Sequence, residues 1–296
     1  MTEITMSDVL YLVDQPSLVE FCTGLRGAAW LALDTEFIRE QTYHPQLCLI
    51  QVASTDQIAC IDPLALPSLE PLLAILYDPT VTKVLHAAYQ DLEIFHGLRG
   101  AVPTPIFDTQ LAAAALGYGN QVGYANLAQQ MLGVELAKIH TRVNWRQRPL
   151  APEWLAYAAD DVRYLRDIYR QQWAMLTACG ELEGLAEPFA ALAEPARYQP
   201  QPQEAWRRIR DHQRLRGGSQ QAVLQALAAW REEQAIRDDR PRRWILHDSP
   251  LLDMARYMPA DLDSLAQIHG LPPATLRRHG RTLLTLIAAA RTESPE

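Results

Sequence analysis

The sequence predicts an α/β domain followed by a smaller all-α domain. Apolar strand-like runs with helical patterns among them fill the chain as far as about residue 124, and only helical periods follow. The stretch EPARYQPQPQE (194–204) has three prolines and few apolar side chains, which favours a linker because proline removes a backbone donor. We therefore expect a first domain over residues 1–200 and a second over residues 203–293.

In the first domain, four runs have the apolar character of strands: residues 30–37 (WLALDTEF), 46–54 (QLCLIQVAS), 57–62 (QIACID) and 82–88 (TKVLHAA). Helical patterns cover residues 67–78 and 91–98, and residues 105–117 are typical of a short strand that runs into a helix. Strands mixed with helices in this way favour a sheet with helices packed on it.

The second domain has only helical periods. We expect helices over residues 205–215 and 220–239, a turn at 240–244, and three shorter helices after it. The last of these contains Gly280, and because glycine is unfavourable inside a helix we expect a break there.

Composition excludes several classes of protein. No apolar run approaches the roughly 18 residues of a membrane span. The N-terminal stretch MTEITMSDVLYLVDQ is acidic and lacks the basic and apolar regions of a signal peptide, so a cytoplasmic protein is expected. The four cysteines are scattered without C-x-x-C spacing, which favours neither disulfides nor zinc.

The formal net charge is −8, and it is unevenly spread. Residues 206–291 contain 15 Arg against 9 acidic residues, a balance of +6. Residues 1–205 contain 12 basic and 24 acidic residues, a balance of −12. This asymmetry indicates two domains with different partners, and the basic one suits electrostatic capture of nucleic acid.

Asp34 and Glu36 end the first predicted strand, with Thr35 between them. Side chains two residues apart in a strand point to the same face, so the two carboxylates should lie side by side. Like charges at this spacing repel unless a positive group lies between them. One alternative stays open at this point: the strand has already ended, and both acids are solvated loop residues.

Asp91 and Asp161 are candidates for further carboxylates beside Asp34 and Glu36. Asp91 follows the apolar run 82–88, where a strand gives way to a helix, although an acid there can also cap that helix. Asp161 shares a helical stripe with Tyr157 and Leu165, which should pack inward. An unpaired carboxylate on that stripe would be costly to bury, so it needs an arginine or a metal ion.

The neighbouring Asp160 is expected to behave differently. It has Arg163 three residues on, which is the spacing of a surface ion pair. We therefore expect Asp160 to be a solvated acid and Asp161 to be the functional one.

Four carboxylates without cysteine or paired histidine suit Mg²⁺ or Mn²⁺. They can hold two such ions roughly 3.5–4 Å apart, an arrangement that stabilises both the attacking and the leaving oxygen of a phosphoryl displacement. Metal ions would then supply the positive charge that Asp34 and Glu36 require.

Three motifs of the sequence resemble those of a known enzyme superfamily. D-T-E (34–36), H-x-x-x-x-D (86–91) and Y-x-x-x-D (157–161) resemble, in this order, the motifs of the DEDD exonuclease superfamily in its tyrosine-containing branch. Wider phrases such as DTEFIRE, LHAAYQDLEIF and YAADDVRYL are similar to bacterial ribonuclease D, over most of the chain. Residues 206–291 resemble one HRDC domain, a helical module that binds nucleic acid. The resemblance implies a ribonuclease H-like mixed sheet in the first domain.

The resemblance also implies roles. Asp34 would bridge two metal ions, Glu36 and Asp161 would complete the site of the attacking water, and Asp91 would serve the second ion. Tyr157 would orient the water, because a phenol with a pKa near 10 is a poor base by itself. The implied activity is 3′→5′ exoribonuclease action that releases nucleoside 5′-monophosphates, above all at tRNA 3′ ends, by a monomer that needs no protein partner or membrane.

Further residues are candidates for RNA contact, each beside a structural alternative. His86 lies near the substrate in the family but can equally be a satisfied polar group. Arg142, Trp145 and Arg148 combine arginine with an aromatic ring, which suits phosphate contact and base stacking, whereas a basic loop with a buried tryptophan is equally consistent. Asp108 is expected to cap a helix. In the second domain, an arginine cluster could tether RNA or could pair with acids of the first domain: Arg207, Arg208 and Arg210.

Two other functions remain open on the sequence. The motifs do not distinguish ribose from deoxyribose, so a DNA exonuclease of the same superfamily fits them as well. An RNA-binding protein with an inactive nuclease core is the non-enzymatic alternative, and the intact set of carboxylates argues against it.

Overall fold

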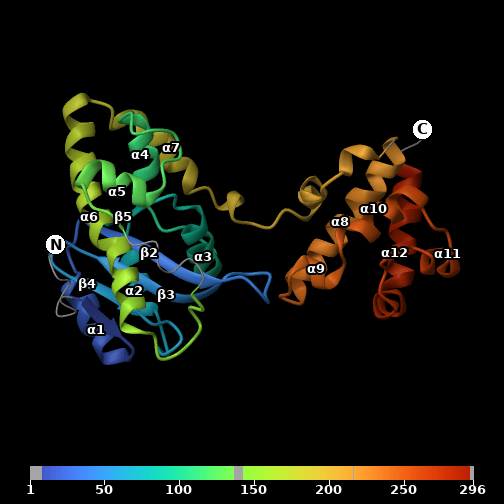
Figure 1. Cartoon of the computed structure of the whole chain (residues 1–296), viewed down its shortest axis with the longest axis horizontal. Coiled ribbons are helices and arrows are strands. Elements are labelled where there is room, and N and C mark those ends of the chain that lie inside the picture. Colours follow the sequence, from blue (N-terminus) through green and yellow to red (C-terminus); the bar gives the residue numbers. More distant parts are fainter. Residues whose placement is uncertain (1–8, 137–142, 216, 294–296) are drawn as a thin grey trace. The chain divides into compact units, whose positions relative to one another are not determined.

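The computed structural model describes residues 9–136, 143–215 and 217–293. The chain divides into two compact units (Figure 1). The first contains the described residues up to Ile38 and those from Gln46 to Gln199, and the second contains Arg39–Pro45 and the chain from Pro200 onward. We call them the nuclease unit and the helical unit. No described helix is both long enough and apolar enough to cross a lipid bilayer.

The nuclease unit is built on a mixed sheet. Within the described residues it has six strands, in the order β1-β4-β3-β2-β5-β6. The central strands β2, β3 and β4 pair antiparallel, whereas β1 joins β4, β5 joins β2 and β6 joins β5 in parallel. Their bounds are Val9–Leu12 (β1), Trp30–Ile38 (β2), Gln46–Ala53 (β3), Ile58–Ile61 (β4), Thr82–Leu85 (β5) and Ile106–Asp108 (β6).

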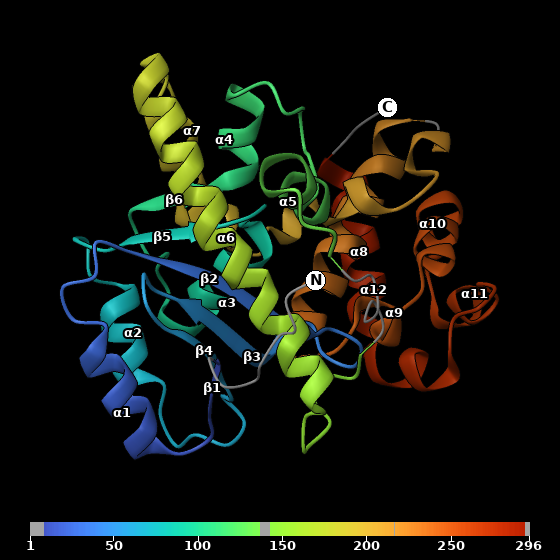
Figure 2. The same ribbon diagram turned by 60° about the vertical axis from the view of Figure 1, so that its left-hand side comes forward.

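Helices cover both faces of this sheet, which is why its central strands are apolar on both sides. The long helix α6 lies across one face (Figure 2), where its buried side chains share a core with Ala32, Cys60 and Val84. Helices α1, α2 and α3 bury the opposite face against Leu31, Leu33 and other strand residues. The helices of this unit are α1 (Gln15–Gly24), α2 (Glu70–Leu76), α3 (Tyr89–Arg99), α4 (Thr109–Ala115), α5 (Tyr124–Leu132), α6 (Pro152–Cys179) and α7 (Ala186–Leu192).

The helical unit has a separate core. Leu224 and Leu227 of the long helix α8 pack with Met254 and Leu283 from two other helices. Its helices are α8 (Gly218–Arg237), α9 (Arg242–Ile245), α10 (Asp248–Tyr257), α11 (Leu262–Ala266) and α12 (Pro273–Glu293). The segment Arg39–Pro45, which joins β2 to β3 in the chain, is also part of this unit. There the backbone N–H groups of Tyr43 and His44 donate to the carboxylate of Asp239, at 3.1 and 3.0 Å.

Two predictions for the helical unit are wrong. Helix α12 runs through Gly280 without a break. A Cβ atom at this position would lie 2.9 Å from the Leu262 side chain and 3.2 Å from that of Leu276, so the glycine permits close helix packing. The expected helix over 205–215 is replaced by two short 3₁₀ helices, Pro202–Arg208 and His212–Arg214. Between them Asp211 adopts a left-handed φ of 69°, which interrupts the helical path.

The predicted linker is packed over its first half. Tyr198 is buried in the core of the nuclease unit, and its hydroxyl donates to the carbonyl of Leu192 at 2.6 Å. The units divide immediately after it, between Gln199 and Pro200. Strand β1 and helix α1 were absent from the sequence interpretation, because both are short and lie in a stretch with no clear period.

Candidate active site

Three carboxylates from two elements meet on one face of the sheet. Strand β2 contributes Asp34 and Glu36, and helix α6 contributes Asp161; one oxygen of each lies within 4.8 Å of one oxygen of each of the others. The strand period explains the first two, since Ala32, two residues before Asp34, packs against α6. The alternative of two solvated loop acids is wrong, because both residues lie inside β2.

Asp91 approaches the group from a different element. It lies in the first turn of α3 and is buried, and its carboxylate accepts a hydrogen bond from the Thr35 hydroxyl. Because Thr35 separates Asp34 from Glu36 in β2, this bond ties the start of α3 to the strand that bears both acids. Repulsion from Asp91 contributes to the raised pKa of Asp34, which places Asp91 electrostatically beside the group.

Burial raises the pKa of every acid in the group, and repulsion from the other acids of the group raises the pKa of Asp34 and Glu36 further. Burial raises the pKa of Glu36 to about 8, with Asp161 as the next contributor, and raises the pKa of Asp161 to about 7. The pKa of Asp91 rises to about 6, chiefly by burial, and that of Asp34 lies well above its usual range for the same reason. The site is therefore unfavourable to its own ionised form unless cations enter it.

The donor set fits hard divalent cations. Asp34, Glu36 and Asp161 offer carboxylate oxygens at a spacing that one ion can bridge, with no histidine or cysteine in the group. Such all-oxygen sites suit Mg²⁺ or Mn²⁺ rather than zinc or copper. Bound cations would also stabilise the ionised carboxylates and so oppose the rise of the four pKa values.

Tyr157 lies one helical turn before Asp161 on α6. Burial raises the pKa of its phenol, and the charges of Asp161 and Glu36 raise it further, so the hydroxyl stays neutral at physiological pH. Its ring stacks on Trp145, with centroids 6.4 Å apart. A neutral hydroxyl at this position can hold a water by hydrogen bonding but cannot act as a strong base.

Asp160 differs in part from expectation. Its predicted ion pair with Arg163 is present, at 3.5 Å. Its predicted solvation is wrong, because only 20% of the side chain is exposed and burial raises its pKa. Helix α6 is covered over more of its circumference than a two-sided helical wheel suggests.

His86 is held by the protein on both sides of its ring. Nδ1 lies 3.0 Å from the Thr109 hydroxyl, and Nε2 lies 3.0 Å from the carbonyl oxygen of Val122. Burial lowers the pKa of the imidazole, which favours its neutral form. These partners favour the reading of His86 as a satisfied polar group, and its contact with substrate stays a prediction.

Asp108 caps α4, as predicted, by accepting from the backbone of Gln110 and Leu111. It also accepts from the backbone N–H groups of Ala87 and Ala88, at 3.2 and 2.9 Å. Ala87 has a left-handed φ of 53°, so the carboxylate holds a strained turn directly before α3 and Asp91. This second role had no sequence signal, since the partners lie 20 and 21 residues apart in the chain.

Arg148 and Trp145 are built into the fold. The Arg148 guanidinium forms a bidentate ion pair with Asp62. It also donates to the carbonyls of Cys48 and Trp145, at 2.7 and 2.6 Å. The indole of Trp145 is buried. These contacts favour the structural alternative for both residues. Arg142 lies outside the described residues.

The arginines of the predicted tether differ in their contacts. Arg207 pairs with Glu204 and lies over the ring of Trp206, whereas Arg208 lies 3.7 Å from Glu232. Arg210 is exposed. The first two arginines are thus partly used inside the helical unit.

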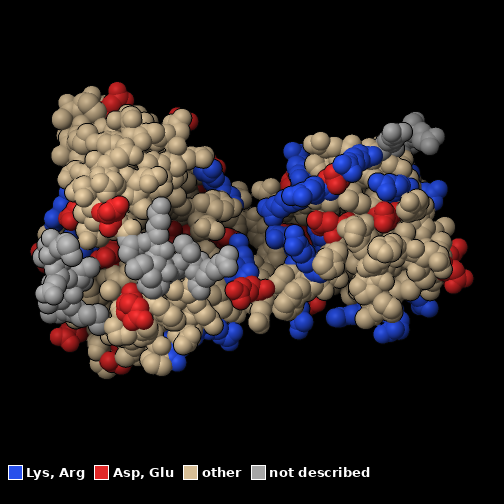
Figure 3. All heavy atoms as spheres, viewed as in Figure 1, with Lys and Arg blue, Asp and Glu red and all other residues tan. Residues whose placement is uncertain are grey.

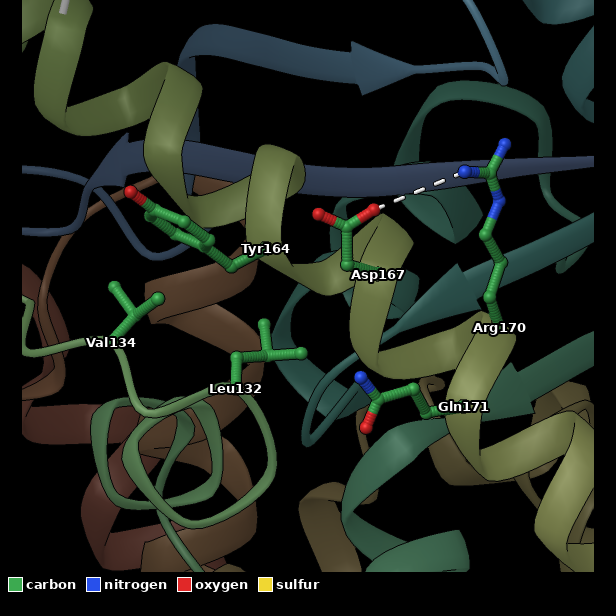
Figure 4. Close-up of a pocket in the computed structure, with 6 residues that line it drawn as sticks. All are labelled: Leu132, Val134, Tyr164, Asp167, Arg170 and Gln171. Carbon is green, nitrogen blue, oxygen red and sulfur yellow. Dashed lines mark ion pairs between the residues drawn. The ribbon is translucent and has the colours of Figure 1, made fainter. Parts of the chain in front are cut away.

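A cavity on the outside of α6 is distinct from the carboxylate group. It has a volume of about 430 Å³ and is lined by residues from the end of α5 and from α6 (Figure 4). Its charged residues, Asp167 and Arg170, pair with each other at 4.0 Å. Because neither belongs to the carboxylate group, we assign this cavity no part in the chemistry.

Comparison with known proteins agrees with this geometry. A family model described as 3′-5′ exonuclease matches residues 11–177, and one described as HRDC domain matches residues 220–287. Ribonuclease D of Acidiphilium cryptum is 42% identical over 279 residues, which cover 93% of this chain and 70% of that protein.

Solved structures extend the similarity to three dimensions. The crystal structure of Escherichia coli RNase D, described as an exoribonuclease involved in structured RNA processing, matches with a TM-score of 0.85 and 37% identity, covering 96% of this chain and 75% of that chain. The catalytic core of RRP6 from Trypanosoma brucei shares the fold, with a TM-score of 0.73, 20% identity and coverage of 99% and 82% of the two chains. The chain therefore belongs to the ribonuclease D family of 3′→5′ exoribonucleases.

Proposed function

We propose that the protein removes nucleotides from RNA 3′ ends with two divalent ions, Mg²⁺ or Mn²⁺, held by Asp34, Glu36, Asp91 and Asp161. The observation that carries this proposal is the convergence of three carboxylates within 4.8 Å of one another. Asp34 would contribute to both ions, Glu36 and Asp161 to the ion beside the attacking water, and Asp91 to the other. When bound, such ions make a water nucleophilic at neutral pH and neutralise charge on the phosphate.

The protein's own groups would act on the water and the substrate end. Tyr157 keeps a neutral hydroxyl, which can hold the water in line with the terminal phosphodiester. Stacking on the buried Trp145 fixes the orientation of that phenol. Attack by water on the phosphorus, with departure of the 3′ oxygen of the preceding nucleotide, releases a nucleoside 5′-monophosphate and leaves a new 3′ hydroxyl.

A direct test follows the products of cleavage. RNA labelled at its 5′ end should shorten one nucleotide at a time in Mg²⁺ or Mn²⁺, and EDTA should stop the reaction. A matched DNA oligomer should be degraded more slowly. Equal rates on both would favour the DNA exonuclease, and absence of metal-dependent mononucleotide release would favour an inactive RNA-binding protein.

For the natural substrate we propose structured RNA precursors, with tRNA 3′ ends foremost. The E. coli relative is described as acting in structured RNA processing, and the family resemblance extends this to tRNA. Sequencing RNA 3′ ends from cells lacking the protein should reveal tRNA precursors with extra 3′ nucleotides. We also propose that the protein acts as a monomer, because one chain supplies all four carboxylates, and that it acts in the cytoplasm, where these precursors occur.

For the helical unit we propose capture of single-stranded RNA. Arg side chains gather over this unit in Figure 3, and the unit contains no lysine. A cavity of about 490 Å³ within it is lined by Arg240, Trp244 and Arg278, and 57% of Trp244 is exposed. An exposed indole beside arginines suits base stacking together with phosphate contact. This cavity, rather than the partly paired Arg207 and Arg208, is the better candidate for RNA contact.

A further inference from the structure

Gln51 is a fully buried amide with unused hydrogen-bonding groups. Its side chain lies in strand β3 with no exposed surface. Neither its amide oxygen nor its amide nitrogen has a hydrogen-bond partner among the described residues. Burial of an unpaired amide is unfavourable, so each such group in a folded protein requires a reason.

The position of Gln51 in the sheet supplies a reason for its unpaired amide. In the register of the sheet, Gln51 lies directly opposite Asp34 on β2 and opposite Cys60 on β4. Residues directly opposite in an antiparallel pair project to the same face, with Cβ atoms roughly 4.5–5.5 Å apart. Leu49 and Ala53, two residues to either side of Gln51, pack in the core that includes α6. The unpaired amide therefore shares with Asp34 the face on which the carboxylates converge.

Packing alone does not explain an amide here. The neighbouring side chains on this face are Leu49, Ala53 and Cys60, all buried and apolar in character. A methionine would fill nearly the same volume without an unpaired donor and acceptor. The amide therefore serves the site on this face of the sheet rather than the packing of the sheet.

We propose that Gln51 is a positioning residue, whose Nε2–H group donates to the Asp34 carboxylate in the metal-loaded site. This inference rests on the proposed two-ion function. The amide would fix the orientation in which Asp34 offers its oxygens, much as outer partners orient the ligands in other metal sites. Its carbonyl oxygen remains available to accept from water that enters with the ions.

The test compares two buried glutamines in one domain. Gln51→Met removes the amide beside Asp34. Gln172→Met removes an equally buried amide on α6, one that already donates to the Thr109 carbonyl at 3.0 Å. For each variant we would measure the thermal unfolding midpoint in EDTA and the Kd for Mn²⁺ by titration calorimetry, with Asp34→Asn as the reference for a lost ligand.

The two variants should differ in both the unfolding midpoint and the Kd for Mn²⁺. Gln51→Met should leave the metal-free midpoint unchanged or raise it, and should weaken Mn²⁺ binding about 10-fold, as loss of an outer partner does in other metal sites. Gln172→Met should lower the midpoint, because the Thr109 carbonyl loses its side-chain donor, and should leave the Kd for Mn²⁺ unchanged.

The opposite results would overturn the inference. A Gln51→Met protein that unfolds at a lower temperature but binds Mn²⁺ with an unchanged Kd would show that the amide is structural. If the unaltered protein binds Mn²⁺ tightly while Gln51→Met does the same, only the role of Gln51 fails. If the unaltered protein binds no Mn²⁺, the two-ion function fails and the role of Gln51 with it.

Discussion

Asp34 and Glu36 are placed side by side by the period of one strand, and Asp161 reaches them from a helix far along the chain. Burial and repulsion raise the pKa of each, with Glu36 at about 8 and Asp161 at about 7. Such raised pKa values in one cluster are typical of a functional site. The chemistry of each residue follows from this shared environment.

Asp34→Asn should abolish cleavage while the fold persists. The change removes the carboxylate proposed to contribute to both ions, so the rate on 3′ RNA ends should fall roughly a thousand-fold or more. The metal-free protein should melt at the same temperature or higher, because repulsion within the cluster decreases. The exposed Asp56→Asn variant is the matched control and should retain full activity. Substantial cleavage by Asp34→Asn in saturating Mg²⁺ would exclude Asp34 from the site.

Stability of the metal-free protein should fall as pH rises. Unfolded carboxyls titrate near pH 4, whereas those of Asp161 and Glu36 have pKa values of about 7 and 8 in the folded protein. The folded state thus binds more protons over this window, and stability present at about pH 4 is lost progressively up to about pH 8. Urea unfolding in EDTA at several pH values measures the slope. Saturating Mn²⁺ should flatten it, and a slope that is flat without metal would contradict the assignment.

Some of these residues could be identified from sequence and others could not. The D-T-E spacing indicates a shared face, since a strand period involves only adjacent residues. The engagement of Arg148 by Asp62, 86 residues away, depends on tertiary structure and has no local signal. The same holds for His86 and the carbonyl of Val122. Long-range partners decided which candidates are structural.

Helix α6 combines a structural and a functional stripe. Its buried residues Ala158, Val162 and Leu165 pack on the sheet, and the adjacent positions carry Tyr157 and Asp161 to the site. Because the helix spans the sheet, a rotation of one residue would replace Asp161 by Asp160 at the cluster. The choice between these two neighbours is therefore a test of the helix placement.

Asp161→Asn should abolish activity, and Asp160→Asn should not. Asp160 pairs with Arg163 and is not part of the three-carboxylate group. Its replacement should leave the rate within a few-fold of the original, and should lower stability because Arg163 loses a partly buried ionic partner. Rates on a short single-stranded RNA and urea unfolding curves measure both effects. Activity lost in Asp160→Asn but kept in Asp161→Asn would show that the helix face is assigned incorrectly.

Element boundaries show where sequence reasoning is weak. Glycine is unfavourable in a helix on average, yet Gly280 lies inside α12 because a side chain there would collide with Leu262. The strands around the site can be predicted from the sequence, because their apolar runs are long and buried on both faces. Where two helices approach closely, tertiary packing outweighs the low helix propensity of glycine.

The two units carry opposite charge balances, with an acidic nuclease unit and a basic helical unit. An acidic catalytic domain repels its polyanionic substrate except where metal ions are bound. A basic surface elsewhere in the chain would offset this repulsion and raise the local concentration of RNA. The sequence indicated this division by charge, but the residues that expose their charge could be identified only from the fold.

Trp244→Ala should weaken binding of single-stranded RNA by the whole protein. Loss of one stacking base contact should raise the Kd roughly 5- to 100-fold. Tyr257→Ala is the matched control, because Tyr257 is 67% exposed on the same unit but does not line the cavity. Replacing Arg240 and Arg278 by Gln should also reduce the slope of log K against log salt. Equal effects of Trp244→Ala and Tyr257→Ala would exclude the cavity as a binding site.

Removal of residues 203–296 should leave a nuclease that still cleaves short RNA. The nuclease unit has its own core and contains all four carboxylates. On longer RNA the truncated protein should show a raised KM with little change in kcat. The lost contacts would bind the substrate equally well in the ground state and in the transition state. Steady-state kinetics on RNAs of two lengths measure this. A truncated protein that is folded but inactive on short RNA would contradict the division of labour.

The central claim is that the carboxylate group binds two metal ions, and anomalous diffraction from crystals soaked in Mn²⁺ tests it most directly. The account predicts two Mn²⁺ peaks roughly 3.5–4 Å apart, with Asp34 in contact with both and with Glu36 and Asp161 on one of them. Peaks only at other positions, or none at a Mn²⁺ concentration that supports cleavage, would contradict it.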